Sequence, residues 1–195
     1  MADGEPRHPV EVELNASATD IMDAIAAGFR AKIDVKGKLA ELFLNRDLRR
    51  LKDAGAIEGY VWNDTDGHPD FSVTVGGIEV IIECKNVRSP TVAEAKLARE
   101  KWRSRVELQK TRNSKDGTPT RGYRTDEFDV LSVALFNQTG KWEYVHVLTV
   151  GLERRPDDPD RLVIMQPVPL QPSGIWKGNL LDVLKEAAQA KRTRG

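Results

Sequence analysis

The hydrophobic positions change from a helical to a strand period along the chain. Ile21, Ile25 and Phe29 lie four residues apart, which predicts a helix over residues 17–33. Residues 1–15 show no such period, so we expect them to form a loose N-terminal arm.

The remaining elements follow from the same pattern, together with the positions of glycine and proline. They are a helix at 35–52, strands at 59–62, 70–75 and 78–85, a helix from 91 to about 112, strands at 128–136, 142–150 and 161–168, and a helix from about 179 to 192. This order predicts an α/β fold with a central mixed β-sheet flanked by helices. We expect a single domain over 16–195, with its core at about 36–150 and a C-terminal strand and helix at 161–192.

The clearest local structure is a hairpin around Gly76 and Gly77. Two glycines between two β-rich runs are typical of a two-residue turn, because both turn positions need positive φ. Directly opposed residues then have numbers that sum to 153, and one face of the hairpin is wholly apolar. On the other face Asp70 lies opposite Glu83, and Lys85 follows two residues beyond Glu83.

Two opposed carboxylates repel each other, so a purely structural role for Asp70 and Glu83 is unfavourable. A divalent cation would convert that repulsion into binding, and carboxylate oxygens are ligands that Mg²⁺ prefers. An adjacent lysine can orient a water molecule and neutralise developing charge. The alternative is that Glu83 and Lys85 form surface ion pairs and that Asp70 caps a loop.

The chain of 195 residues has no net charge, with 30 basic and 30 acidic residues, but the charge is unevenly spread. Residues 85–124 contain twelve basic and four acidic side chains, so this segment carries +8 and the rest of the chain −8. Such a segment is typical of a surface that binds a phosphate backbone, although a solvated charged helix would have the same composition.

Other features exclude several classes of protein. The single cysteine, Cys84, rules out an intramolecular disulfide, and with three scattered histidines it also excludes a zinc cluster. The sequence contains no P-loop, signal peptide or apolar run of membrane-spanning length. We therefore expect a cytoplasmic protein.

Pro69-Asp70, twelve intervening residues and Glu83-Cys84-Lys85 resemble the signature of the PD-(D/E)xK nuclease superfamily, which has a restriction-endonuclease-like fold. The resemblance implies that Asp70 and Glu83 bind a metal, that Cys84 lends only its backbone carbonyl, and that Lys85 assists the attacking water. It also implies a helical glutamate upstream of the hairpin. Glu41 matches that position and is a fourth candidate for the catalytic and metal-binding set, although it could instead pair with an arginine.

The resemblance implies that DNA, most simply duplex DNA, is the partner of the basic segment. The residues expected to contact it are Gln109, Lys110, Arg112, Arg121 and Arg124. Gln109 fits a solvated position at least as well. Asp129 either adds a carboxylate to the site or pairs locally.

These observations predict a Mg²⁺-dependent DNA endonuclease, with Mn²⁺ as a substitute metal, of a restriction or defence type. Three alternatives stay open: a structure-specific repair nuclease or junction resolvase, a non-catalytic DNA-binding module on the same fold, and a structural protein in which the carboxylate pair is a coincidence. The sequence leaves open whether the chain forms a homodimer.

Overall fold

The structure is a computed structural model, and it describes residues 7–63, 65, 68–90, 104–109 and 122–193. Internal contacts divide the chain into two units, Met1–Leu39 and Ala40–Gly195. No helix among these described residues combines the length and apolar composition of a membrane span.

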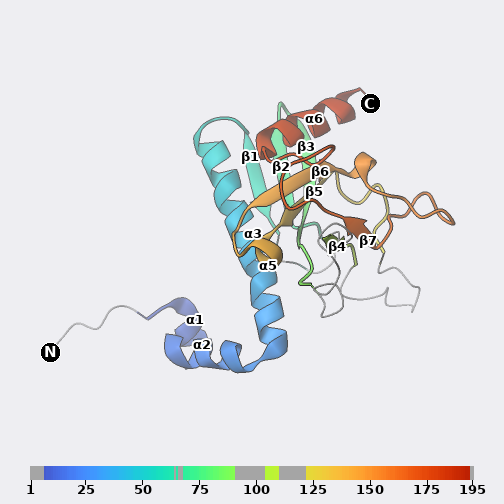
Figure 1. The fold of residues 1–195 in the computed structure, drawn as a ribbon. Helices are drawn as coiled ribbons and strands as arrows, with labels where there is room; N and C mark the ends of the chain where they lie inside the picture. The colour runs from blue at the N-terminus through green and yellow to red at the C-terminus, as the bar shows by residue number, and fades with distance from the viewer. Residues whose placement is uncertain (1–6, 64, 66–67, 91–103, 110–121, 194–195) are drawn as a thin grey trace, which may run out of the picture. The chain divides into compact units, whose positions relative to one another are not determined.

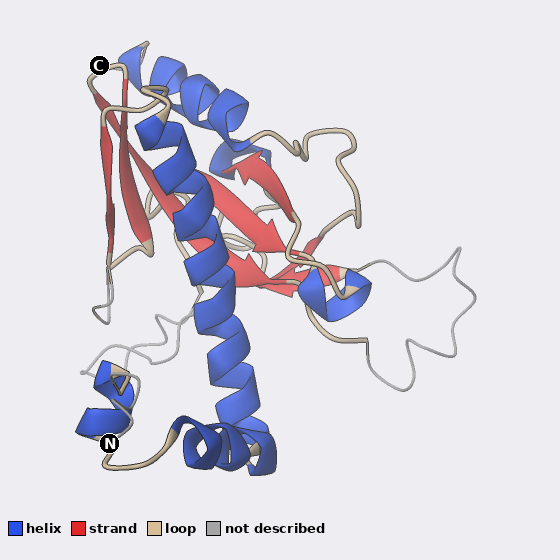
Figure 2. Cartoon of the chain, turned by 90° about the vertical axis from the view of Figure 1, so that its left-hand side faces the viewer, coloured by secondary structure: helices blue, strands red, loops and turns tan. Residues whose placement is uncertain are grey.

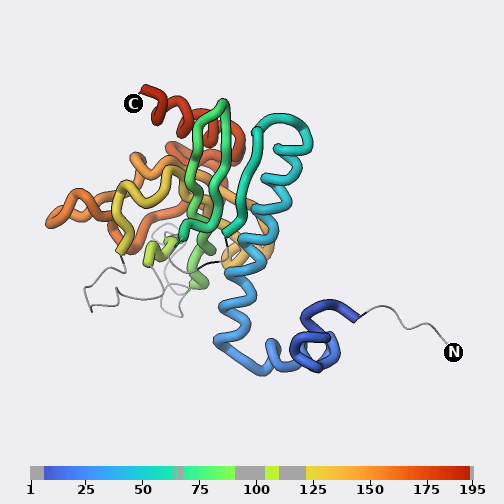
Figure 3. The backbone as a smooth tube through the Cα atoms, turned by 180° about the vertical axis from the view of Figure 1, so that it is seen from behind, coloured from blue at the N-terminus to red at the C-terminus, as the bar shows by residue number. Residues whose placement is uncertain are grey.

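The first unit is helical. It contains α1 (Pro9–Glu13), α2 (Ala18–Ala27) and the first turns of α3 (Phe29–Asp53), drawn in blue in Figure 3. Ser17 caps α2, since its Oγ accepts a hydrogen bond from the amide of Asp20 and the Asp20 carboxylate accepts one from the amide of Ser17. Part of the expected N-terminal arm thus forms α1, and the arm's boundary at residue 15 stays a prediction.

The predicted helix boundary near residue 34 is wrong. The break lies at Gly28, whose extended backbone (φ −89°, ψ 114°) ends α2. Residues 33–35 instead continue α3 without interruption, because no glycine or proline breaks the chain there.

The second unit is built on a five-stranded mixed sheet in the order β1-β2-β3-β5-β6 (Figure 1). The strands are β1 (Gly59–Trp62), β2 (Phe71–Val75), β3 (Ile78–Asn86), β5 (Val130–Ala134) and β6 (Tyr144–Leu148). β3 and β5 pair in parallel, and the other neighbouring strands are antiparallel. The α/β class with a central mixed sheet and flanking helices is therefore confirmed.

The predicted hairpin register is confirmed. Val75 pairs with Ile78 and Phe71 with Ile82, and the turn glycines Gly76 and Gly77 have φ of +57° and +74°. The C-terminal helix α6 (Leu180–Arg192) holds this turn, because Arg192 donates a hydrogen bond to the carbonyl of Gly76.

The two faces of the sheet are covered differently. Residues of α3 from Ala40 onward and residues of α6 form one core with the apolar face of the hairpin, and both helices lie along the sheet in Figure 2. A second core on the opposite face joins Ile81 to side chains that include Val106, Tyr123 and Leu162.

Beyond the hairpin the predictions are partly wrong. The helix expected to reach Arg112 does not include residues 104–109, because Arg105–Glu107 form β4 and pair antiparallel with β7 (Met165–Pro167). Val106 is buried between two exposed neighbours, which is the period of a strand. Residues 91–103 and 110–121 lie outside the described part of the chain. The strand predicted at 161–168 shortens to β7.

The ends of β5 and β6 also differ from the prediction. A single helical turn, α5 (Phe136–Thr139), follows β5, and a 3₁₀ turn (Thr149–Gly151) ends β6. The C-terminal helix is confirmed, with the Asn179 side chain accepting hydrogen bonds from the amides of Leu181 and Asp182.

Candidate active site

The hairpin brings Asp70 to the end of β3. The Oδ2 atom of Asp70 accepts a hydrogen bond of 2.7 Å from the backbone amide of Cys84, across the two strands. This bond fixes the Asp70 carboxylate beside the residue that precedes Cys84, which is Glu83. The charge of Glu83 also raises the pKa of Asp70, so the two carboxylates lie within electrostatic reach of each other, as the facing register predicts.

Glu83 is held by two donors on the same oxygen. The ammonium of Lys85 and the hydroxyl of Tyr123 both donate to its Oε1. The Lys85 Nζ also lies 5.5 Å from the centroid of the Tyr123 ring. The Glu83 side chain is only 6% exposed and that of Lys85 is 25% exposed, so this ion pair is shielded from water. A shielded pair interacts more strongly than one on the open surface.

The surroundings of the site raise the pKa values of both Asp70 and Lys85. Burial, and next the negative charge of Glu83, raise the pKa of Asp70 to about 7. Burial by itself would lower the pKa of the Lys85 ammonium. The neighbouring Glu83, Tyr123 and Asp70 outweigh the effect of burial, so this pKa is raised above its ordinary value. Lys85 therefore stays protonated at neutral pH and acts as a cation and hydrogen-bond donor in this state.

Glu41 approaches the same group from α3. Its Oε2 accepts a hydrogen bond of 3.1 Å from the indole nitrogen of Trp62 on β1. Trp62 in turn stacks on Phe71, with ring centroids 6.0 Å apart. Glu41 contributes less than Glu83 to the raised pKa of Asp70, but its contribution places it within electrostatic reach of that carboxylate.

The donor set suits a hard divalent cation. No group of three or more His, Cys, Asp or Glu side chains among the described residues forms a ready metal cluster. Two adjacent carboxylates, however, are sufficient for Mg²⁺, which keeps several waters and takes phosphate oxygens as its other ligands. Burial, and next the charge of Glu83, raise the pKa of Asp70, and a bound cation would offset both effects by stabilising the ionised carboxylate.

The Cys84 side chain takes no part in this arrangement. It is a free, buried thiol in the core beneath α3 and α6, on the face opposite to Glu83, as the alternation predicts. Burial, and next the charge of Asp70, raise the pKa of this thiol. A protonated thiol is a poor nucleophile, so only the backbone of Cys84 belongs to the site.

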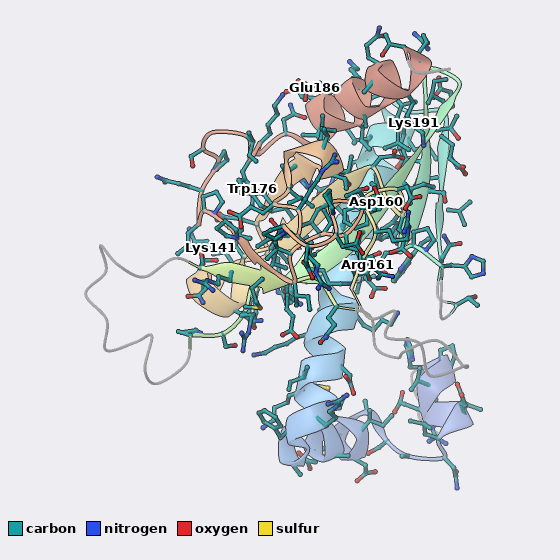
Figure 4. All side chains as sticks on the ribbon, turned by 90° about the vertical axis from the view of Figure 1, so that its right-hand side faces the viewer. Lys141, Asp160, Arg161, Trp176, Glu186 and Lys191 are labelled. Atoms are coloured by element: carbon teal, nitrogen blue, oxygen red, sulfur yellow. The ribbon has the colours of Figure 1, made fainter. Side chains whose placement is uncertain are left out.

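The predicted DNA contacts are only partly described. Lys110, Arg112 and Arg121 lie outside the described residues. Gln109 forms an isolated bridge with Gly122, in extended rather than helical backbone. Arg124 is half-exposed and pairs with Asp126 at 3.2 Å and with Asp160 at 3.8 Å; Figure 4 labels Asp160 beside Arg161. The guanidinium of Arg124 is thus shared by two carboxylates.

Asp129 is a structural residue. Its Oδ2 accepts hydrogen bonds of 2.8 Å from the amide of Ile81 and from the ammonium of Lys191 on α6, which is labelled in Figure 4. Asp129 therefore pairs with groups far from it in the sequence, 48 and 62 positions away, rather than locally.

Sequence reasoning missed Tyr123 and the role of Trp62. Tyr123 lies in a loop between two β-bridges, Gln109–Gly122 and Arg124–Arg161, and only tertiary contacts carry its hydroxyl to Glu83. No local pattern in the sequence indicates this contact. Trp62 ends a predicted strand, and its hydrogen bond to Glu41 depends on how α3 lies against β1.

Among known proteins, only solved structures show a similarity to this chain. No protein-family model and no curated protein matches the chain. Among solved structures, the chain is similar to a bacterial homing endonuclease, I-Ssp6803I, with 15% sequence identity and a TM-score of 0.41. The match covers 60% of this chain and 68% of the other.

Proposed function

We propose that this protein is a metal-dependent endonuclease of the PD-(D/E)xK type that hydrolyses phosphodiester bonds in DNA. The observation that carries the proposal is the hairpin register, which makes neighbours of Asp70 and Glu83 and pairs Glu83 with Lys85. The helix α3, which carries Glu41 before the hairpin, and the antiparallel β2–β3 pair also agree with what the resemblance implies.

The charges of the site support catalysis more than they support a structural role. Two buried carboxylates beside each other destabilise the folded chain, as the raised pKa of Asp70 indicates. Such a cost is typical of active sites, where groups are held in arrangements that stability alone would not favour. Glu41 brings a third carboxylate within electrostatic reach of Asp70.

Asp70 and Glu83 would hold the metal, together with the backbone carbonyl of Cys84, and Glu41 would support it. Bound Mg²⁺ or Mn²⁺ would lower the pKa of a coordinated water and neutralise charge on the scissile phosphate. The protonated Lys85 would donate a hydrogen bond to the attacking water or to the phosphate. Tyr123 would keep Glu83 in place when Lys85 turns toward substrate.

The basic segment supports a nucleic-acid substrate. The net charge of +8 in residues 85–124 begins at Lys85, so the basic segment directly follows the catalytic strand in the sequence. Lys110, Arg112, Arg121 and Arg124 are the proposed phosphate contacts, and Gln109 is a weaker candidate. We infer that duplex DNA lies along this segment.

The direct test is cleavage of supercoiled plasmid DNA in Mg²⁺ or EDTA. The wild-type protein should cut only with metal. Asp70→Asn, Glu83→Gln and Lys85→Met should each reduce the rate by about 100-fold or more, because each removes charge from the reacting centre. Glu41→Gln should reduce it less.

Matched controls separate chemistry from folding. Glu79→Gln makes the same change as Glu83→Gln on the same strand and the same face, but at an exposed position. Lys141→Met matches Lys85→Met at a side chain that is 71% exposed. Both controls should cut like wild type. Equal cleavage by Asp70→Asn, Glu83→Gln and the wild type would exclude the proposed mechanism.

A further inference from the structure

The first unit of the chain exposes an unusual amount of apolar surface. Six of the ten large apolar side chains that are exposed among the described residues belong to residues 7–39: Val10, Val12, Leu14, Met22, Phe29 and Ile33. Phe29 is 78% exposed and Ile33 48% exposed, and their spacing of four residues puts them on one side of α3. Single exposed apolar residues are common, but a concentration of this kind marks an interaction surface.

α2 in particular needs a covering partner. It has ten residues, most of them apolar, and neither it nor α1 contains a buried residue. Isolated helices shorter than about 12 to 15 residues are marginal in water, and helices in proteins gain most of their stability from packing an apolar face. α2 therefore has the composition of a packed helix without the contacts of one.

The charges of this unit fall into two consecutive segments of opposite sign. Residues 7–27 carry one basic side chain and four acidic ones, a net charge of −3. Residues 28–39 carry four basic side chains and one acidic one, a net charge of +3. A unit with an acidic segment and a basic segment of equal and opposite net charge is complementary to a copy of itself turned by 180°.

We propose that residues 7–39 form a homodimer interface, in which the acidic half of each copy lies on the basic half of the other. A two-fold axis repeats every contact, so each charge pair occurs twice, and Met22, Phe29 and Ile33 are covered at the centre. The interface uses no residue of the hairpin that carries Asp70 and Glu83, and the proposal holds whether or not that hairpin cleaves DNA.

The first experiment is the molar mass in solution, measured by light scattering and sedimentation over a range of protein concentrations. The full chain should be a dimer. A Phe29→Asp, Ile33→Asp variant should be monomeric at concentrations where wild type is dimeric. Val150→Asp places the same charge at a position that is 57% exposed outside this unit, and it should leave the dimer intact. Far-UV circular dichroism checks that all variants are folded.

The second experiment tests the two-fold charge pairing. Asp23→Lys and Arg30→Asp should each weaken the dimer by about tenfold, since each puts like charges opposite one another. The doubly reversed chain, with both substitutions, should recover most of the lost affinity, because opposite charges face each other again. High salt should reduce all three effects.

Two results would overturn the proposal. One is a wild-type chain that is monomeric at all concentrations while Phe29→Asp lowers its melting temperature, which would mean that residues 40–195 of the same chain cover the patch. The other is a dimer whose affinity Phe29→Asp and the charge reversals leave unchanged.

Discussion

The two faces of the β2–β3 hairpin have opposite character, one apolar and one charged. On one face Phe71, Val73 and Ile82 are fully buried beneath α3 and α6. On the other face, Asp70 and Glu83, each the sequence neighbour of a buried residue, form a shielded group of charges with Lys85. The same alternation of side chains produces both faces, so a shift of one residue in register would destroy both.

The comparison separates what holds the hairpin together from what the hairpin does. Burial of the apolar face stabilises the folded chain. The charged face contains Asp70, whose pKa is raised to about 7 by burial and next by Glu83. Substitutions on the first face should therefore cost stability, and substitutions on the second should cost activity while leaving stability unchanged or improved. Four predictions test this contrast, in order of decreasing effect on free energy.

Phe71→Ala should reduce the free energy of unfolding by about 3–5 kcal/mol, because it removes a fully buried aromatic ring from the core. Urea denaturation followed by circular dichroism measures the change. Glu79→Ala, on an exposed position of the paired strand, should change the free energy by less than about 0.5 kcal/mol. Similar losses from both variants would mean that the two faces are not distinct.

His146 should make the core beneath α3 and α6 sensitive to acid. Burial lowers the pKa of His146 from its ordinary value of 6.5 to about 4, and its Nδ1 lies 2.9 Å from the Ser132 hydroxyl. The unfolded chain binds a proton below pH 6.5 and the folded chain does not, so stability is full above pH 6.5. It should fall by about 3 kcal/mol as the pH drops to 4.

The measurement is urea denaturation of wild type and His146→Asn at several pH values between 4 and 8. The difference between the two curves isolates His146 from the carboxylates that titrate in the same range. A difference that does not change with pH would contradict the prediction.

Asp70→Asn should stabilise the protein in EDTA at pH 8, by about 2 kcal/mol after allowance for partial hydration of the site. The folded pKa of Asp70 is raised from 3.8 to about 7, so the stability linked to its neutral form is present below pH 3.8 and lost as the pH rises through 7. Asparagine keeps an oxygen that accepts from the amide of Cys84 but carries no charge. The gain should vanish at pH 4, and a loss of stability at pH 8 would refute the idea that the carboxylates repel.

Tyr123→Phe should reduce the free energy of unfolding least, by about 1 kcal/mol, because it removes only the hydroxyl that donates to Glu83. The ring keeps its edge-to-face contact with Phe128, at 5.5 Å between centroids. We expect the Mg²⁺ concentration for half-maximal cleavage to rise about fivefold. Tyr60→Phe, which loses only a 3.5 Å contact to the Asn45 carbonyl, serves as the control.

The hairpin could be predicted from the sequence because everything that determines it is local. Two glycines set the turn, alternation sets the faces, and the register places Asp70 next to Glu83 without reference to the rest of the chain. The boundary between α2 and α3 depends on Gly28, which the helical period of the flanking residues concealed.

The features that could not be predicted depend on residues far apart in the chain. Arg105–Glu107 become β4 because they pair with Met165–Pro167, about sixty residues later. The Tyr123 hydroxyl reaches Glu83 across forty positions of sequence. A strand of three residues is too short to show a hydrophobic period, and a single tyrosine in a loop has none, so no sequence pattern predicts these contacts.

The parallel pairing of β3 with β5 has a consequence for how this protein could diversify. A parallel neighbour requires a crossover connection, so the chain leaves the sheet after Asn86 and returns before Val130. That connection contains nearly all of the basic segment, whereas the register that joins Asp70 to Glu83 is complete before the connection begins. Insertions, deletions and substitutions in it can therefore change the charge of the connection without altering the register of the hairpin. Under the proposed function, the hairpin that carries the reaction and the basic residues that hold the nucleic acid can therefore vary separately, as long as Tyr123 keeps its hydrogen bond to Glu83.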